Sequence, residues 1–396
     1  KMKVYYWSPF ISHVATVTAV INSIISFKKF SMDNNDYRVI NVFKEWSAYE
    51  NELKKNKIES IDLGTFLNIN FLPKSGFIKS RFTYILTYLF SIIKLHKFLK
   101  KEKPEFFIIH LISSIPLTLL MLFSYETKFV LRISGYPKMT FFRKLLWKSC
   151  NKKLYKVFCP TDFTKNYMIK NNIFSGVKIF LVRDPVINVK EINKNKKLNI
   201  GVNLNWIKNK KYIISIGRLT KQKNFIFLIN EFSKVVFKYP DLNLIILGDG
   251  DEKRNLKNLI IKKKLNNKIF LLGNQKNIYP LLLNSLFFTL TSDWEDPGFV
   301  ILEAMFAKKI VLSSNCESGP IDIIKDNSNG FLFKNNNSKD FQLKLSLIID
   351  LLKKDDLNNK KILKLALKTS KFYTLFNHYK DISPHFNQNI HTLLNK

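Results

Sequence analysis

Residues 286–307 contain, in order, an apolar run, a Pro-Gly turn and a second apolar stretch of helical length. The run 286–290 predicts a buried strand, Pro297 and Gly298 predict the turn, and 299–307 predicts a helix. A helix that begins directly after a strand presents free backbone N–H groups, and the positive end of its dipole, to whatever binds there. The segment therefore predicts a place for an anionic ligand, with Glu295 and Glu303 on either side of the turn.

A second segment of the same kind lies upstream. Residues 212–217 predict a buried strand that ends in Gly217, and apolar residues at helical spacing predict a helix over 225–239. Arg218 and Lys223 flank the loop between them. A planar guanidinium and a mobile ammonium in such a loop suit the neutralisation of a diphosphate.

Strands and helices alternate along the whole chain, which predicts an α/β fold with parallel sheets. Seven of the 12 glycines lie between Gly217 and Gly330, where they mark the tight turns of one repeating strand–turn–helix region. The N-terminal half has its own strand candidates at 4–7, 39–42, 106–110, 128–132 and 157–159. Ligands of such sheets bind at the carboxyl ends of strands, and Arg218, Asp249, Trp294 and Glu295 follow predicted strands.

The two segments together resemble the C-terminal half of the retaining GT-B glycosyltransferases, most closely those of family 4. That family has G-R-x(4)-K after a strand and, further on, E-x7-E around a Gly-rich turn. The matching residues are Gly217, Arg218, Lys223, Glu295, Gly298, Phe299 and Glu303. The resemblance covers roughly residues 212–340 and implies the GT-B architecture, with two doubly wound Rossmann-like domains and a cleft between them.

The resemblance also implies roles for individual residues. A nucleotide-diphospho-sugar is the expected co-substrate, with Arg218 and Lys223 at its diphosphate, Glu295 at the donor sugar and Glu303 at the ribose hydroxyls. No metal or other cofactor is expected. Asp249-Gly-Asp251 has the spacing of a D-x-D metal motif, but its place between a strand and a helix favours a turn with an N-cap. The residues expected to bind the donor, besides Arg218, Lys223 and Glu295, are Gly217, Asp249, Gly298, Phe299, Val300 and Glu303.

The expected organisation is an acceptor-binding domain over 1–190, a linker over 191–211, a nucleotide-sugar-binding domain over 212–372, and a C-terminal helix in 373–396 that crosses back to the first domain. Candidate contacts to the sugar or acceptor in the first domain are His13, His110, Arg132 and Ser134. A lone histidine at a strand end is more often structural, so His13 and His110 keep that alternative.

The net charge of +35 is extreme, and Lys, Asn, Ile and Phe are all heavily used. Charge alone is compatible with nucleic acid, an anionic membrane or phosphorylated acceptors, but no nucleic-acid-binding motif is present. Aromatic and basic residues share two amphipathic segments, 78–103 and 141–156, which suit an anionic bilayer surface or, equally, a solvated basic face. Residues 106–123 could pass for a membrane span, but a strand followed by a buried helix explains them better.

These observations favour a cytoplasmic glycosyltransferase, peripheral on the inner face of the cell membrane, that extends a glycan or lipid-linked acceptor during synthesis of a surface polysaccharide such as O-antigen, capsule or lipopolysaccharide. Three cysteines without metal-ligand spacing and the lack of a signal-peptide cleavage site agree with that compartment. A non-catalytic polyanion-binding protein explains the charge but not the paired glutamates. A GT-B relative with other chemistry, such as a nucleotide-sugar epimerase or a phosphorylase, is the nearer alternative.

Overall fold

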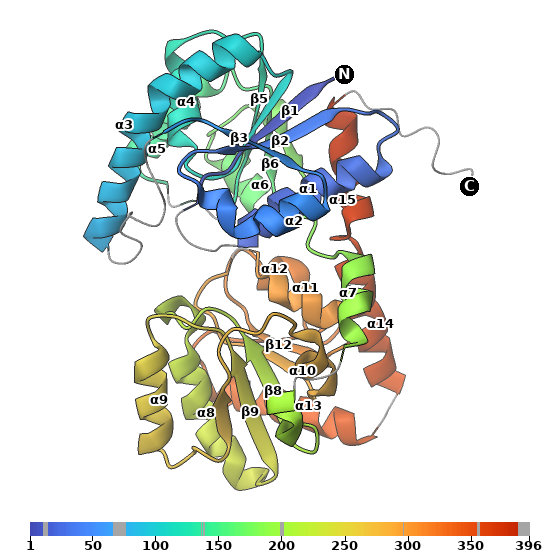
Figure 1. The fold of residues 1–396 in the computed structure, drawn as a ribbon. Helices are drawn as coiled ribbons and strands as arrows, with labels where there is room; N and C mark the ends of the chain where they lie inside the picture. Colours follow the sequence, from blue (N-terminus) through green and yellow to red (C-terminus); the bar gives the residue numbers. More distant parts are fainter. Residues whose placement is uncertain are drawn as a thin grey trace. The chain divides into compact units, whose positions relative to one another are not determined.

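The computed structural model describes residues 1–10, 15–65, 77–135, 137, 139–198, 202–295, 297–354 and 357–386, without the side chains of 77–83 and 202–203. The chain divides into two compact units (Figure 1). Unit 1 comprises Lys1–Pro185 and Leu375–Lys396, and unit 2 comprises Val186–Thr374.

Unit 1 is built on a seven-stranded sheet in the order β3-β2-β1-β4-β5-β6-β7, and every pair of neighbours is parallel. The order reverses between β1 and β4, as in doubly wound folds. The strands are β1 (Lys3–Trp7), β2 (Asp36–Asn41), β3 (Glu59–Asp62), β4 (Phe106–Ile109), β5 (Lys128–Arg132), β6 (Lys156–Cys159) and β7 (Ile179–Leu181).

Both faces of this sheet are buried. Along β1, Tyr5 and Trp7 point into one core while Val4 and Tyr6 point into the other, because successive side chains of a strand alternate. The first core is covered by α3 (Phe77–Glu102), α4 (Ser114–Leu122), α5 (Phe141–Cys150) and α6 (Asp162–Lys170). The second is covered by α1 (Ala15–Phe30), α2 (Glu50–Lys55), α15 (Leu375–Ile382) and the turns η1 (Glu45–Tyr49) and η5 (Ser383–Phe386).

Helix α15 completes unit 1 from the far end of the sequence. It packs along α1, where the Tyr379 ring meets Phe27 edge-on at 5.8 Å between centroids. Its His378 donates from Nδ1 to the carbonyl of Arg183 at 2.6 Å, and its Nε2 shares a hydrogen bond of 2.9 Å with Ser23 Oγ. The end of the chain therefore supplies part of the core of the N-terminal unit.

Unit 2 is built on a six-stranded parallel sheet in the order β10-β9-β8-β11-β12-β13. This is the same doubly wound order as in unit 1, and it reverses between β8 and β11. The strands are β8 (Lys211–Ile216), β9 (Leu242–Leu247), β10 (Ile269–Leu271), β11 (Phe288–Leu290), β12 (Val311–Ser314) and β13 (Phe331–Phe333).

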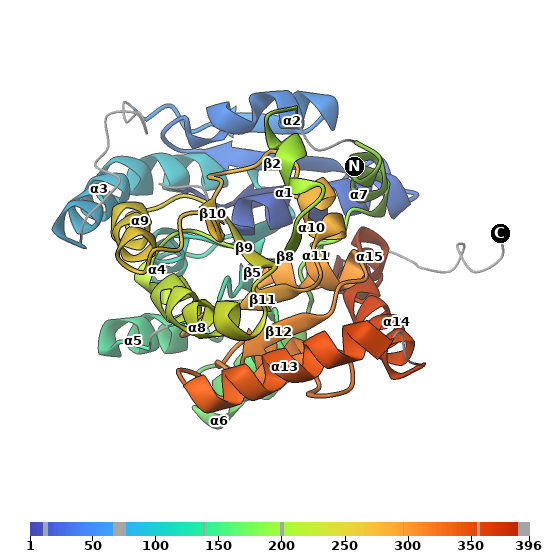
Figure 2. The same ribbon diagram turned by 90° about the horizontal axis from the view of Figure 1, so that it is seen from below.

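Helices also cover both faces of the second sheet. One core includes side chains of α8 (Phe225–Lys238), α9 (Lys253–Lys262) and α13 (Ser338–Lys354). The other includes those of α7 (Val189–Lys196), α10 (Tyr279–Asn284), α11 (Phe299–Phe306), α12 (Pro320–Ile323) and α14 (Leu357–Lys371). Figure 2 shows α13 and α14 following one another, in orange and red, along this unit.

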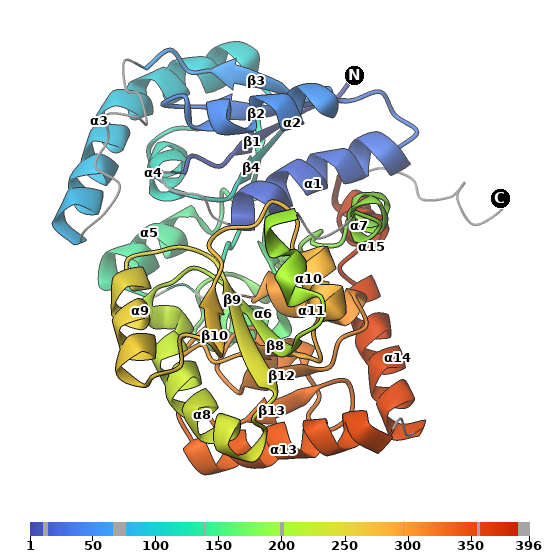
Figure 3. The ribbon, with the colours of Figure 1, turned by 60° about the horizontal axis from the view of Figure 1, so that its bottom comes forward.

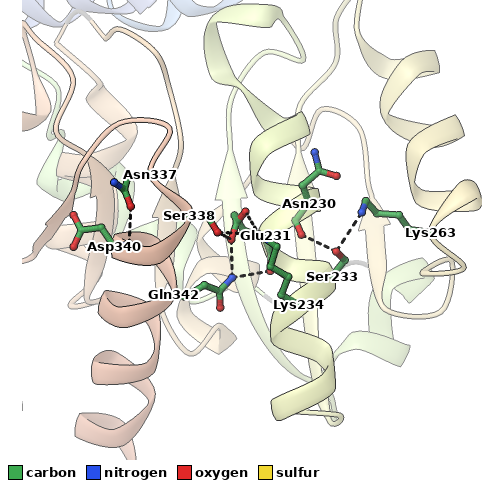
Figure 4. Close-up of polar contacts among 9 residues, drawn as sticks. All are labelled: Asn230, Glu231, Ser233, Lys234, Lys263, Asn337, Ser338, Asp340 and Gln342. Atoms are coloured by element: carbon green, nitrogen blue, oxygen red, sulfur yellow. Dashed lines mark hydrogen bonds and ion pairs between the residues drawn. The ribbon is translucent and has the colours of Figure 1, made fainter.

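A buried carboxylate fastens α13 to α8 (Figure 4). Glu231 on α8 is almost completely buried, and it accepts hydrogen bonds from Lys234 Nζ at 2.8 Å, Ser338 Oγ at 2.8 Å and Gln342 Nε2 at 2.9 Å. Burial raises the pKa of Glu231, but the hydrogen bonds from Gln342, Lys234 and Ser338 outweigh burial and leave the pKa below its usual value.

The stretch 191–211, expected to be a linker, is part of unit 2. It contains the end of α7 and the turn η3 (Val202–Ile207), and its Ile192 and Ile207 lie in the same core as β8 and α11. Lys196 Nζ donates to the carbonyl of Phe306 at 3.2 Å. Ile192 and Ile207 are the buried side chains among the described residues of this segment, and the other described side chains are partly or fully exposed.

Residues 106–123 form β4 and then α4, as expected from the sequence. Their apolar character reflects burial, since Ile115, Leu117 and Leu119 all lie in the core of unit 1. Among the described residues, none of the helices combines the length and apolar composition that a membrane crossing requires.

Candidate active site at the carboxyl ends of β8 and β11

The order of the second sheet places the two sequence segments side by side. β8 pairs with β11, with Ile214 opposite Phe288, and the chain leaves these two strands toward opposite sides of the sheet. A crevice forms where such connections diverge, and ligands of doubly wound sheets bind there. The loop after β8 carries Arg218 and Lys223, and the loop after β11 carries Glu295.

Hydrogen bonds tie these two loops together. The Asp293 amide donates to the carbonyl of Gln222 at 2.9 Å, and Gln222 Nε2 donates to the carbonyl of Trp294 at 2.8 Å. Thr291 Oγ1 lies 3.2 Å from the carbonyl oxygens of both Lys223 and Asn224. The loops therefore form one unit, although about 70 residues of sequence separate them.

Asn224 is the residue that fixes the end of the first loop. Its backbone is left-handed, with φ of 47°, and its side chain accepts from the Phe227 amide at 3.3 Å and so caps α8. The same side chain donates to Asp293 Oδ1 at 3.0 Å. Sequence reasoning missed this role, although an Asn immediately before an apolar helix is a typical N-cap.

Lys223 and Glu295 form an ion pair inside the joined loops. Their side chains are only 12% and 5% exposed, and Ser292 Oγ also donates to the same carboxylate oxygen. Two opposite charges this deeply buried stabilise one another, and removing either leaves the other unpaired. The structure thus brings together the two residues that were assigned to the diphosphate and to the donor sugar.

Arg218 lies at the mouth of the same loop. Its side chain is exposed, and within the described residues it has no hydrogen bond or ion pair. Gly217 and Gly248 bring the loops after β8 and β9 into direct backbone contact, since a Cβ on Gly248 would lie 1.9 Å from the Gly217 carbonyl oxygen.

The turn into α11 has the form expected of a helix that begins at a ligand site. Gly298 is the N-cap, and its φ of 80° is a backbone conformation that other residues adopt only with strain. The amides of Phe299 and Val300 open the helix, and both residues are half-buried. The first N–H groups of a helix have no partner within it, so they are available to an anion.

Glu303 sits one turn further along α11 and is half-buried. Burial raises the pKa of its carboxyl to about 7. Among the described residues, no hydrogen bond or ion pair of this carboxylate is found. A carboxyl of this kind can accept a hydrogen bond from a ligand hydroxyl when ionised and donate one when protonated.

Asp249 is exposed and bound within its own loop. Its carboxylate accepts from the Gly250 amide at 2.8 Å and pairs with Lys253 Nζ at 2.8 Å. These contacts hold the pKa of Asp249 below its usual value. The predicted turn is present, but the N-cap of α9 is Glu252, whose side chain makes no capping hydrogen bond.

The candidates of unit 1 lie in its interior or outside the described residues. His13 is outside them. Arg132 is buried and pairs with Asp184, and His110 is buried beside Tyr6. Burial, together with Arg132 and His378, holds the pKa of His110 well below its usual value.

The space around these side chains is small. A cavity of about 10 Å³ is lined by Tyr6, Ser23, His110, Arg132, Asp184 and His378, among others, and such a volume holds one water at most. Arg132 and His110 thus occupy a polar cluster inside unit 1, where sequence reasoning expected contacts to sugar or acceptor. Ser134 is half-buried, and its Oγ has no hydrogen-bond partner among the described residues.

Comparison with known sequences points to one family. Residues 197–363 match the family model described as Glycosyl transferases group 1. An uncharacterized glycosyltransferase of Methanocaldococcus jannaschii is 34% identical over 246 residues, which cover 58% of this chain and 60% of that protein. The N-acetylgalactosamine-N,N'-diacetylbacillosaminyl-diphospho-undecaprenol 4-alpha-N-acetylgalactosaminyltransferase of Campylobacter jejuni is 34% identical over 146 residues, 36% of this chain and 39% of that enzyme. The chain thus spans 60% or less of the length of these two relatives.

Solved structures share the fold over nearly the whole chain. The Anabaena protein Alr3699/HepE, in complex with UDP, has a TM-score of 0.74 at 16% identity and covers 97% of this chain and 99% of its own. A glycosyltransferase from Rickettsia africae has a TM-score of 0.74 at 20% identity, with 97% and 98% covered. The second unit is thus similar in sequence to the Glycosyl transferases group 1 family, and the whole chain shares the fold of these solved structures.

Proposed function

We propose that this chain transfers a sugar from a nucleotide-diphospho-sugar to a glycan or lipid-linked acceptor, with retention at the anomeric carbon. The observation that carries the proposal is the buried Lys223–Glu295 pair between β8 and β11, with Arg218 and the N-terminus of α11 beside it. Cationic, anionic and N–H groups meet there at one crevice, as a charged donor requires.

The cationic groups of the site bind the diphosphate of the donor. Arg218 and Lys223, with the first amides of α11, stabilise the negative charge that builds on the leaving phosphate. Two cations and a helix N-terminus supply this charge without a metal ion. The Anabaena protein, which shares the fold, was solved in complex with UDP, and this supports a nucleoside diphosphate as part of the donor.

The two carboxylates bind the two sugars of the donor, which are the transferred sugar and the ribose. When the donor binds, the ion pair between Lys223 and Glu295 opens. Lys223 then contacts the phosphate, and Glu295 contacts the transferred sugar and stabilises the positive charge that develops on it. Glu303 binds the ribose hydroxyls. The acceptor hydroxyl attacks from the face that the diphosphate leaves, and its proton passes to the departing phosphate oxygen.

The acceptor is a growing surface glycan or its lipid-linked precursor, such as that of an O-antigen, a capsule or a lipopolysaccharide, and the reaction takes place in the cytoplasm at the inner face of the membrane. The support is chemical likeness among relatives: the Campylobacter enzyme is named for an acceptor that carries diphospho-undecaprenol.

The test is thermal stabilisation of the purified chain by UDP-, GDP-, ADP-, TDP- and CMP-linked sugars. A ligand at 100 times its Kd stabilises a protein by about 2.7 kcal/mol, which raises Tm by several degrees. We expect one nucleotide diphosphate to produce that shift and Arg218→Ala to abolish it. Lys262→Ala is the matched control, because Lys262 is an exposed cation at the far end of α9.

Two outcomes would contradict the proposal. One is the absence of any shift with every nucleotide, together with a salt-sensitive shift produced by DNA, RNA or heparin, which would identify a polyanion-binding protein. The other is an equal loss of the shift in Lys262→Ala, which would show that the response depends on overall charge.

A further inference from the structure

Unit 1 carries a group of exposed large apolar side chains on three neighbouring helices. Isolated exposed apolar residues are ordinary, but a contiguous group marks an interaction surface. Phe141 and Phe142, at the start of α5, are 75% and 80% exposed. The others are Tyr84, Ile85, Leu89, Phe90 and Ile93 on α3, Met121, Leu122 and Phe123 at the end of α4, and Leu145 on α5.

Helix α3 is apolar on two sides, and only one of them is covered. Leu95 and Leu99 lie in the core of unit 1, as one face of an amphipathic helix should. Ile85, Leu89 and Ile93 recur every fourth residue and are exposed. This spacing places them in one stripe along the outside of the helix, where none of the described residues of unit 1 buries them.

The three helices form one surface, because α4 packs against both α3 and α5 (Figure 3). Tyr84 on α3 shares a hydrogen bond of 2.6 Å with Ser114 on α4. Lys153, just after α5, donates to the carbonyls of Met121 and Phe123 at 3.0 and 3.1 Å. We call this set of exposed residues on α3, α4 and α5 the apolar face.

Basic side chains border the apolar face, and acidic ones are missing from its two longest segments. Residues 77–101 and 141–156 contain no Asp or Glu. They contain instead Lys94, Lys97, Lys100, Lys101, Arg143, Lys144, Lys148, Lys152 and Lys153. Lys100 Nζ donates to the carbonyl of Ser124 at 3.1 Å, which sets a cation beside the exposed end of α4.

We propose that the apolar face docks unit 1 on an anionic phospholipid surface. Aromatic and aliphatic side chains enter the boundary between headgroups and acyl chains while lysines and arginines meet the phosphates. The helices lie along the surface, since none of the described helices is suited to cross it.

Charge decides between this occupant and a second copy of the chain. A two-fold contact between copies would set the same basic segments against one another, with no acid in either segment to pair with them. An anionic bilayer supplies the opposite charge over the whole face. The inference is independent of the donor site, whose residues lie on unit 2, so it is tested without any nucleotide.

The test is co-sedimentation of the full chain with vesicles of phosphatidylglycerol and phosphatidylcholine, or of phosphatidylcholine alone, in 50 mM and 500 mM salt. We expect binding to anionic vesicles that weakens at high salt. Leu89→Ala/Phe142→Ala should weaken binding at least about tenfold, as expected from the loss of two inserted side chains. Lys97→Glu/Lys144→Glu/Lys148→Glu should abolish it.

Matched variants on unit 2 control for overall composition and charge. Phe237→Ala removes an exposed aromatic side chain from α8, where Phe237 is 91% exposed. Lys257→Glu/Lys262→Glu/Lys361→Glu makes the same change of charge as the triple variant of unit 1. Both should bind as the unmodified chain does. No binding to anionic vesicles, equal binding to neutral ones, equal losses in the unit 2 variants, or a dimer in solution that Leu89→Ala/Phe142→Ala dissociates would each overturn the proposal.

Discussion

Glu295 is a buried carboxylate that two neighbouring side chains hold in place. It is paired with Lys223 and receives a further hydrogen bond from Ser292. Cys316 is affected by the same surroundings. Burial raises the pKa of its thiol to about 12, and the nearby Glu295 raises that pKa further. The Glu295 side chain is therefore in a buried environment, where electrostatic effects are strongest.

Replacing Glu295 with Gln removes the charge and keeps the shape. We expect turnover to fall at least ~100-fold, the size of the loss when one charge-stabilising contact of a transition state is removed. The measurement is kcat for sugar transfer or, where no acceptor is known, for hydrolysis of the donor found by thermal stabilisation. Glu317→Gln, which changes an exposed carboxylate in the same unit, should retain normal turnover. A Glu295→Gln enzyme with near-normal kcat would remove Glu295 from the mechanism.

At the scale of elements, the contact between helices α8 and α13 depends on the carboxylate of Glu231. Glu231 receives three side-chain hydrogen bonds there, two of them from α13. Because the pKa of Glu231 is lower in the folded chain than in the unfolded one, ionised Glu231 stabilises unit 2 above the ordinary carboxyl pKa. That stabilisation disappears as the pH falls through the lowered pKa.

We therefore expect Glu231→Gln to cost about 2 kcal/mol of unfolding free energy at pH 7, the scale of hydrogen bonds to a buried charged group. The cost should shrink as the pH is lowered below about 4.5, where the unmodified carboxylate in the unfolded chain becomes protonated. Denaturant unfolding of both proteins from pH 7 to pH 3 gives the comparison. A cost that stays constant over this range would show that the effect is one of packing alone.

The sequence predicts elements well where the pattern is local. The strand that ends at Gly217, the Pro297-Gly298 turn and the helix after it all follow from adjacent residues. β3 was not predicted because its four residues are largely exposed and show no alternation, and β12 because Ser313 and Ser314 interrupt its apolar run. The segment 191–211 was mistaken for a linker because two isoleucines were outnumbered by Lys and Asn.

The sequence named candidate residues for the site, whose roles stay predictions, but it did not show the contacts among them. Two motifs named Arg218, Lys223 and Glu295, yet the ion pair between Lys223 and Glu295 joins residues 72 positions apart and depends on the strand order of the sheet. The role of Asn224 was missed because one of its contacts, the hydrogen bond to Asp293, joins two loops that are distant in the sequence. In unit 1, Arg132 is the last residue of β5, where a ligand residue could lie, but its partner Asp184 comes from a distant part of the chain.

At the scale of the whole molecule, the chain passes between its units twice, and both passages lie side by side. Ile187 forms a parallel bridge with Thr374, and its amide donates to the carbonyl of Tyr373 at 2.9 Å. After Thr374 the chain returns to unit 1, where Tyr379, Ile382 and Phe386 enter the core beside α1. The N-terminal unit is thus completed by C-terminal residues.

A chain that ends at Thr374 tests this directly. We expect unit 2 to keep its stability and unit 1 to lose several kcal/mol, because three large side chains leave its core and each truncation of that kind costs about 3 kcal/mol. Hydrogen exchange followed by mass spectrometry resolves the two units. Protection of β1 and α1 should fall while that of β8 and β9 is kept, and unchanged protection in unit 1 would contradict the assignment of α15 to its core.

The return of α15 also sets the order in which the molecule can be finished as it is made. Many proteins complete their N-terminal domain first as the ribosome releases the chain. Here every residue of unit 2 has been synthesised by Thr374, whereas unit 1 still waits for residues up to Phe386. The unit that is translated first is therefore the last to complete its fold. Until α15 is made, the apolar side chains that it covers are accessible to chaperones.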